Sequence, residues 1–348
     1  MTDIIDKRLV ASNFRFVEYN WTLGLTVTFV RLLLSLLLLA TGFTSLPALA
    51  GGYAESLLRL GVGVRSLGMG GAFVPLADDG SAAYWNPAGL AQFRTVQVTA
   101  SHAFIFKNVA DHSFINASFP VGKGLTIGLS WAYLKVDNIP VFAANQGPPG
   151  IVPLPASNSG QVYLLSVAKM FAFDGGSELF GSIPFEIPIA MNIKYVHQSL
   201  GTVVSNGLGL DFGLMARMGL EEATGYRNAG HLALGLSVRD IVGTYVRSNI
   251  GSNKTIKPSI RMGFSYTRPI PRLHGTLILS EQHRIYRSED FLIGGEYWYR
   301  NVLAFRLGGY GKRFTTGGGV IIGPMILDYA YIDQNPTGTH RLGASFTF

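Results

Sequence analysis

The chain has 348 residues, of which 48% are hydrophobic and only 14% are charged, and its formal net charge is +7. Soluble domains carry roughly 25% charged residues, and the basic residues here are dispersed rather than clustered, so we expect no nucleic-acid partner. Cysteine is absent, which excludes disulfides, thiolate metal sites, cysteine nucleophiles and lipid attachment to cysteine.

The first fifty residues are predicted to form a secretory signal peptide. Arg31 precedes a leucine-rich run that ends near Ala40, and Ala48-Leu49-Ala50 follows. A basic flank, a short apolar run and a small-residue end are the parts of such a peptide. We therefore predict that residues 1–50 are removed by cleavage between Ala50 and Gly51.

The alternative for this region is a transmembrane anchor from Leu23 to Ala40. Arg31 would interrupt that anchor at a cost of about 3 kcal/mol, so the signal peptide is favoured. Residues 1–30 are long for the polar start of a signal peptide, and one explanation is a start further along the chain, for instance at Val27 or Val30.

Residues 51–95 are predicted to form a compact segment, or hatch, that fills the interior of a barrel. Its glycines allow close backbone approach and positive φ, and Asp78–Ser81 and Asn86–Gly89 are typical of turns or helix caps. The segment has too few large side chains to fold alone. We interpret the paired aspartates as caps, with a metal or acid–base pair as the alternative. The motif residues are Gly68, Gly70, Gly71, Asp78, Asp79, Asn86, Pro87 and Ala88.

Residues 96–348 are predicted to form an outer-membrane β-barrel. Beyond residue 50 no apolar run reaches the roughly 18 residues of a helical membrane span, whereas a transmembrane strand needs only about 9–11. Alternating segments separated by turn residues indicate fourteen antiparallel strands, near 96–106, 112–120, 124–136, 160–173, 185–198, 206–218, 229–240, 257–267, 272–283, 289–299, 301–311, 315–322, 325–333 and 340–348.

Large apolar side chains alternate with small ones along these segments. Leu232, Leu234, Leu236 and Val238, for example, are predicted to face lipid. A charge facing lipid at mid-bilayer costs about 2–4 kcal/mol, so the strand charges are expected inside the barrel. We interpret them as an ion-paired network that braces the wall, with a polar path for a solute as the alternative. These residues are Asp211, Arg239, Arg261, Glu296, Arg306 and Asp328.

A soluble β-sandwich would also alternate, but its outward face would be rich in Lys and Glu. Here the face opposite the large apolar residues is mostly Gly, Ala, Ser and Thr, which favours a narrow or plugged lumen. An even strand number places both barrel ends on one side, and the longer connections 137–159 and 241–256 then fall on the outer side. The last strand ends in Phe346 and Phe348, which we predict to be a signal for the barrel-assembly machinery.

The stretch Gly68–Ala91 resembles the N-terminal hatch of the PorV/PorQ family, within the FadL-like superfamily of fatty-acid-transporter-type barrels. The resemblance implies a fourteen-stranded outer-membrane barrel plugged by its N-terminal segment, with Asn86-Pro87-Ala88 as the hatch element. Shorter stretches continue the resemblance in order, at 195–198, 207–213, 235–240, 295–298, 306–310, 327–331 and 338–341.

The sequence leaves two candidate functions open. The resemblance to PorV implies protein export, with secreted proteins and a type IX-like secretion apparatus as partners. The alternative is FadL-like transport of hydrophobic small molecules, for which the connection 137–159 would supply an apolar surface. No phosphate loop, zinc motif or nucleophile elbow is present. We therefore predict a protein of the cell outer membrane that is not an enzyme, needs no cofactor, and contacts outer-membrane lipid.

Overall fold

The computed structural model describes residues 60–105, 109–141, 154–175, 183–251, 253–285, 291–311, 313–334 and 337–348. The predicted signal peptide and its cleavage site at Ala50 and Gly51 lie outside these ranges. None of the helices within them has the length and apolar character needed to cross a membrane. The helices are α3 (Val64–Gly68), α4 (Ala82–Trp85), α5 (Leu220–Thr224), η1 (Pro87–Gln92) and η2 (Pro271–Leu273).

Most of the described chain is antiparallel β-sheet. The strands are β1 (Gln97–Ile105), β2 (Ala110–Gly122), β3 (Leu125–Val141), β4 (Leu154–Asp174), β5 (Pro184–Leu200), β6 (Val203–Gly219), β7 (His231–Arg239), β8 (Thr244–Ser248), β9 (Lys254–Ile256), β10 (Ser259–Ile270), β11 (Gly275–Arg284), β12 (Phe291–Tyr299), β13 (Leu303–Tyr310), β14 (Arg313–Ile322), β15 (Met325–Ile332) and β16 (Thr339–Thr347).

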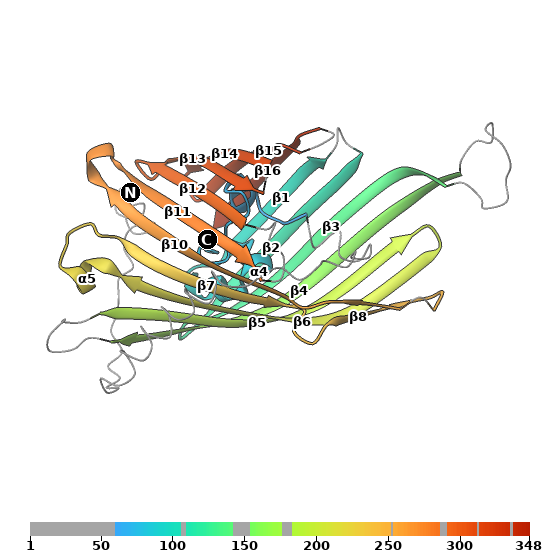
Figure 1. The fold of residues 1–348 in the computed structure, drawn as a ribbon, viewed down its shortest axis with the longest axis horizontal. Helices are drawn as coiled ribbons and strands as arrows, with labels where there is room; N and C mark the ends of the chain where they lie inside the picture. Colours follow the sequence, from blue (N-terminus) through green and yellow to red (C-terminus); the bar gives the residue numbers. More distant parts are fainter. Residues whose placement is uncertain are drawn as a thin grey trace.

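The sheet closes on itself. β1 pairs with β2 on one side and with β16 on the other. The strand order then runs from β5 through β1 and β16 to β6, and the pairing of β5 with β6 completes the ring. β8 and β9 form a hairpin beside β6, so β1–β7 and β10–β16 make up the wall (Figure 1). The predicted all-β barrel of fourteen antiparallel strands is confirmed.

The two ends of the barrel differ. We call the end where β1 begins and β16 ends the terminal end, and the opposite end the far end. At the terminal end, Lys123–Gly124 joins β2 to β3, and Gly323–Pro324 joins β14 to β15. At the far end, β3 and β4 extend beyond their neighbours (Figure 1). The wall is therefore taller on the side of β3–β6 than on the side of β12–β16.

Two predicted connections at the far end are wrong in extent. β3 continues to Val141 and β4 begins at Leu154, so much of the predicted connection 137–159 is strand, and residues 142–153 lie outside the described ranges. The predicted connection 241–256 contains β8 and β9. Backbone hydrogen bonds continue in both places without the apolar alternation on which the prediction depended.

The side chains divide between the two faces as a membrane barrel requires. On β4, Tyr163, Leu165 and Val167 are 44%, 41% and 47% exposed on the outer face. On β7 the residues between the leucines are buried, and they end in Arg239. The predicted separation of apolar and charged residues is therefore present in the wall.

The last strand also presents its apolar stripe outward. Phe346 and Phe348 are exposed on the outer face at the terminal end, with ring centroids 4.6 Å apart. The backbone N–H of Phe348 donates to the carbonyl oxygen of Val96 at 3.0 Å, which ties the end of the chain to the start of β1. Recognition of these rings by an assembly machinery stays a prediction.

Candidate functional site

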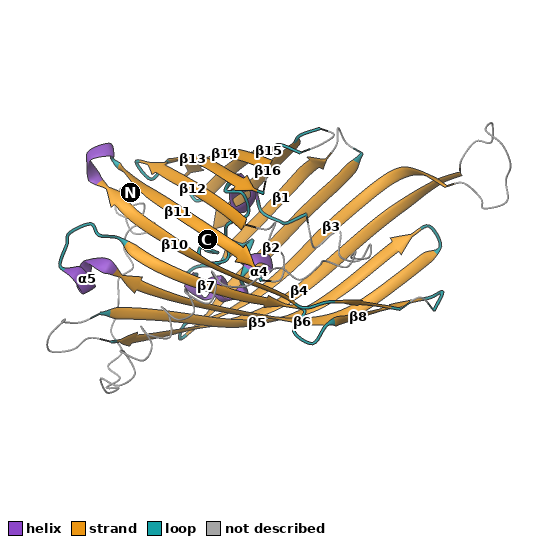
Figure 2. Cartoon of the chain, viewed as in Figure 1, coloured by secondary structure: helices purple, strands orange, loops and turns teal. Residues whose placement is uncertain are grey.

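The interior of the barrel is occupied by the segment that precedes β1. We call Leu60–Val96 the inner segment. Its helix α3 packs against β13–β16, and η1 packs against β3–β6 on the opposite side of the barrel. α4 lies between them within the ring of strands (Figure 2). The inner segment therefore reaches both sides of the lumen.

A series of wall glycines makes room for the inner segment. A Cβ atom at Gly235 would collide with the backbone of Val74 and Pro75, and one at Gly308 would collide with the backbone of Met69 and Gly70. Because these glycines have no side chain, the backbone of the wall can contact the backbone of the inner segment. The inward glycines whose added Cβ would touch the inner segment are Gly128, Gly213, Gly235, Gly263, Gly294, Gly308, Gly317 and Gly343.

Side-chain hydrogen bonds also join the wall to the backbone of the inner segment. On β14, Thr315 Oγ1 donates to the carbonyl oxygen of Gly68 at 3.1 Å. On β5, Asn192 Nδ2 donates to the carbonyl oxygen of Ala83 at 2.7 Å. On β11, Gln282 Oε1 accepts from the backbone N–H of Val74 at 3.0 Å. Because these bonds come from separate strands, they fix both the depth and the rotation of the inner segment.

The Asn86-Pro87-Ala88 element contacts the wall at an irregular point. Asn86 Nδ2 donates to the carbonyl oxygen of Leu214 on β6 at 3.1 Å, and its Oδ1 accepts from the backbone N–H of Ala88 at 3.2 Å. A Cβ at Gly213 would collide with the Asn86 side chain. The element thus forms a small turn that packs directly on β6.

The ladder between β5 and β6 is interrupted beside this turn. Glu186 pairs with Arg217 and Ile189 pairs with Leu214, but Ile187 and Pro188 between them have no ladder partner on β6, although both pair with β4. The register is the same on both sides of the gap. Proline has no backbone N–H to donate, which accounts for a local loss of pairing.

A buried ion cluster joins the inner segment to β12, β13 and β15. Glu296 accepts from Arg65 Nη2 at 2.7 Å and from Arg306 Nε at 2.6 Å. Arg306 Nη1 also contacts Asp328 at 2.6 Å, and Arg65 Nη1 contacts Asp78 at 2.5 Å. Alternating charges with such short contacts stabilise one another in a low-dielectric interior. The predicted charges Glu296, Arg306 and Asp328 thus lie together.

Asp79, the neighbour of Asp78, has a different role. Its Oδ1 accepts from the backbone N–H of Ser81 at 2.8 Å and from the Ser81 hydroxyl at 2.6 Å, which is the geometry of a turn cap. Burial raises the pKa of the Asp79 carboxyl to about 6. Within the described residues no group of His, Asp and Glu side chains is placed to hold a metal ion.

The predicted Asp211 belongs to a separate cluster. Lys194 on β5 is fully buried, and its Nζ lies 2.7 Å from both Asp211 Oδ1 and Asp240 Oδ1. Asp240 adopts a left-handed conformation with φ of 54° directly after β7, and faces inward together with its neighbour Arg239. Strict alternation cannot predict two consecutive inward residues. Lys194, by contrast, shares the inward face with Asn192 and could have been identified.

Arg239 and Arg261 lie against aromatic rings, and Arg239 is also attracted by the nearby carboxylates of Asp211 and Asp240. The guanidinium of Arg239 lies 4.1 Å from the ring centroid of Tyr84, and that of Arg261 lies 5.5 Å from the ring of Trp85. Arg261 is 4% exposed, and its Nε has no hydrogen-bond partner among the described residues. Of the six predicted charges, Glu296, Arg306 and Asp328 thus form one salt-bridged cluster, and Asp211, Arg239 and Arg261 lie outside it.

We expect Arg261→Met to change the free energy of unfolding by less than about 1 kcal/mol. A buried guanidinium without a carboxylate partner gains little Coulomb energy to offset its desolvation, and methionine keeps most of the apolar volume. Urea unfolding in detergent micelles measures this. A loss above about 3 kcal/mol would contradict the absence of a stabilising ionic partner.

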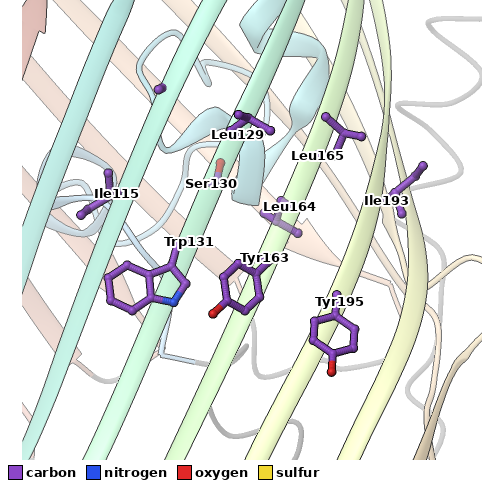
Figure 3. Close-up of a pocket in the computed structure, with 10 residues that line it drawn as sticks. Ile115, Leu129, Ser130, Trp131, Tyr163, Leu164, Leu165, Ile193 and Tyr195 are labelled. Carbon is purple, nitrogen blue, oxygen red and sulfur yellow. The ribbon is translucent and has the colours of Figure 1, made fainter.

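The outer wall has an apolar hollow over β2–β5. Its volume is about 520 Å³, and Trp131, Tyr163 and Tyr195 lie in register across three neighbouring strands (Figure 3). Gln161 Oε1 accepts from Trp131 Nε1 at 3.3 Å and from the Tyr163 hydroxyl at 2.6 Å. The further lining residues are Ile115, Ala117, Leu129, Ser130, Leu164, Leu165 and Ile193.

Comparison with known proteins returns structural similarity only. No family model matches the chain, and no curated protein matches it. The toluene transporter TbuX of Ralstonia pickettii is 11% identical with a TM-score of 0.44, over 82% of this chain and 97% of TbuX. The toluene transporter TodX of Pseudomonas putida is 9% identical with a TM-score of 0.45, over 82% and 98%.

A further solved structure is the outer membrane protein Omp33 of Acinetobacter baumannii, which is 10% identical with a TM-score of 0.38, over 73% of this chain and 98% of Omp33. At these similarities neither a substrate nor an activity is carried over to this chain. The resemblance to the PorV/PorQ family, read from Gly68–Ala91, stays a prediction.

Proposed function

We propose that this chain is an outer-membrane barrel that transports hydrophobic small molecules past its inner segment. The observation that carries the proposal is a closed fourteen-strand wall with an apolar outer face and a lumen filled by Leu60–Val96. A lumen filled in this way is not an open aqueous pore. Passage then requires that the inner segment moves or that the wall opens.

The outer face supports the membrane placement. Large apolar side chains with exposed fractions above one third occur on most wall strands, among them Leu129, Ile193, Phe305 and Leu342. Such a surface would be costly in water, at roughly 25 cal/mol for each Å² of apolar area. The first wall strand begins and the last wall strand ends at the same end of the barrel, which is the arrangement of outer-membrane barrels with even strand numbers.

The interruption between β5 and β6 supports a sideways exit. Ile187 and Pro188 lack ladder partners on β6, and Asn86 of the inner segment donates to the adjacent carbonyl of Leu214. A shift of the inner segment would therefore release a wall position where the β5–β6 ladder is already interrupted. A hydrophobic solute that left by this route would enter the lipid without crossing water.

Cross-linking the inner segment to the wall tests the proposal. A Cβ built at Gly68 lies 3.6 Å from Ala330 Cβ, which is within the range for a disulfide. Because the chain has no cysteine, Gly68→Cys with Ala330→Cys gives one defined bond. We expect the oxidised pair to lose most uptake of a labelled hydrophobic acid or hydrocarbon by cells, and the reductant to restore it.

The two single-cysteine variants are the matched controls for this experiment. Uptake that is unchanged in the oxidised pair would overturn transport by movement of the inner segment. Measuring secreted-protein yield in the same cells tests the export role, which stays a prediction from the family resemblance. A loss of secretion with unchanged uptake would favour export over transport.

A further inference from the structure

Two neighbouring turns at the terminal end form one rigid unit. η2 and His274 connect β10 to β11, and the turn after Tyr299 connects β12 to β13. The backbone N–H of Arg300 donates to the carbonyl oxygen of His274 at 2.7 Å, and the Tyr297 hydroxyl donates to the carbonyl oxygen of Leu273 at 2.7 Å. These bonds hold the backbones of the two turns together.

This unit is cationic and has no acidic neighbours in sequence. Arg272 and Arg300 in the two turns are exposed, as is Arg268 near the end of β10. No Asp or Glu occurs in residues 267–280 or 297–327. The excess of positive charge on this part of the rim is therefore not neutralised from its own strands. We call Arg268, Arg272 and Arg300 the arginine patch.

Apolar side chains border the arginine patch. Leu273 is 58% exposed, Val302 is 40% exposed and Leu303 is 41% exposed. Leu303 begins the outward apolar stripe of β13, which continues in Phe305 and Leu307. The cations thus stand where the apolar outer wall ends, which is the level at which lipid headgroups meet a membrane barrel.

The turn conformations place these cations at the rim. His274 and Arg300 have φ angles of 53° and 49°. The left-handed region disfavours residues other than Gly and Asn. Arg300 nevertheless occupies such a position, and its guanidinium lies 5.3 Å from the ring centroid of Tyr299. The tight hairpin turn thus presents the charge beside an aromatic ring at the rim.

We propose that the arginine patch binds the phosphate groups of anionic phospholipids in the leaflet at the terminal end. Guanidinium groups form paired, charge-assisted hydrogen bonds with phosphate oxygens, and basic residues beside an anionic leaflet strengthen association with it. The bordering leucines and tyrosines contact the first methylene groups below the headgroups. The inference rests on the membrane placement in the proposed function, but it does not depend on transport.

The test uses the full chain in vesicles of phosphatidylcholine, with and without about one third phosphatidylglycerol. The readout is the rate of heat unfolding, followed by gel mobility. We expect phosphatidylglycerol to slow unfolding about tenfold, and 0.5 M salt to remove most of that difference. The triple variant Arg268→Gln, Arg272→Gln and Arg300→Gln is expected to unfold at nearly equal rates in the two lipids.

The matched control removes three exposed cations from the far end, with Arg247→Gln, Lys257→Gln and Arg313→Gln. This control is expected to keep the phosphatidylglycerol effect. Arg272→Gln alone replaces the triple variant if the latter does not insert. Inorganic phosphate added to phosphatidylcholine vesicles distinguishes a free anion from a lipid, and we expect it to have no effect.

Equal unfolding rates of the unmodified chain in both lipids would overturn the proposal, as would an equal loss in the far-end control or protection by inorganic phosphate. The proposed transport function would survive each of these results. Failure to insert into either vesicle would overturn the membrane placement itself, and the arginine patch proposal with it.

Discussion

Replacing Gly308 by leucine is expected to displace the inner segment and to open the barrel to small ions. A side chain at this position collides with the backbone of Met69 and Gly70, and backbone cannot rotate aside as a side chain can. We expect conductance across planar bilayers to rise at least about tenfold. Overpacking of this kind also costs stability, typically about 1–3 kcal/mol.

The adjacent Gly309 provides the matched control. It lies on the same strand but faces outward, where an added Cβ would come no closer than 3.6 Å to the side chain of Ile293. Gly309→Leu should therefore leave conductance unchanged. If Gly308→Leu conducts no better than Gly309→Leu while both fold, the inner segment does not close the lumen at β13.

Replacing Arg306 by methionine is expected to give the largest loss of stability. Arg306 is 1% exposed and contacts both Glu296 and Asp328. Its removal leaves Asp328 without its partner and weakens the link to Arg65. Breaking a buried ion pair by removing one partner costs about 3–5 kcal/mol. The midpoint of urea unfolding, measured in detergent micelles, reports this loss.

The exposed pair Lys135–Asp137 supplies the comparison for that prediction. Its nitrogen–oxygen distance is 2.7 Å, close to those of the buried cluster, but its side chains are 42% and 45% exposed. Solvent screening leaves such an exposed pair with almost no net stabilisation. The midpoint of urea unfolding of Lys135→Met should therefore be close to that of the unmodified chain. Equal losses in Lys135→Met and Arg306→Met would show that burial does not govern the stability of the Arg306 cluster.

Much of the wall could be predicted because alternate residues of a barrel strand face lipid and lumen, and the two environments favour different residue types. Lipid selects Leu232, Leu234 and Leu236, and the filled lumen selects the small residues between them. The pattern is local, so one sequence is sufficient to read it. At the far ends of β3 and β4 the alternation disappears from the sequence although the strands continue, and there the predicted connection was too long.

The grouping of the lumen charges could not be predicted in the same way. Inward direction follows from alternation, but partnership depends on the registers of several strands and on the depth of the inner segment. Arg65 meets Glu296 across 231 positions in the sequence. Asp240 faces inward only because the backbone turns into a left-handed conformation after β7. Neither fact has a local signal in the residues.

The sequence by itself therefore determined the all-β wall, its fourteen strands and the inward direction of the predicted strand charges, because turn residues separate the strands and the two-residue period assigns each residue to a face. The tertiary structure decided where the inner segment contacts the wall, which charges pair, where the β5–β6 ladder breaks and how two turns combine into the arginine patch. These features depend on distances between residues far apart in the chain, and such distances are set only when the barrel closes.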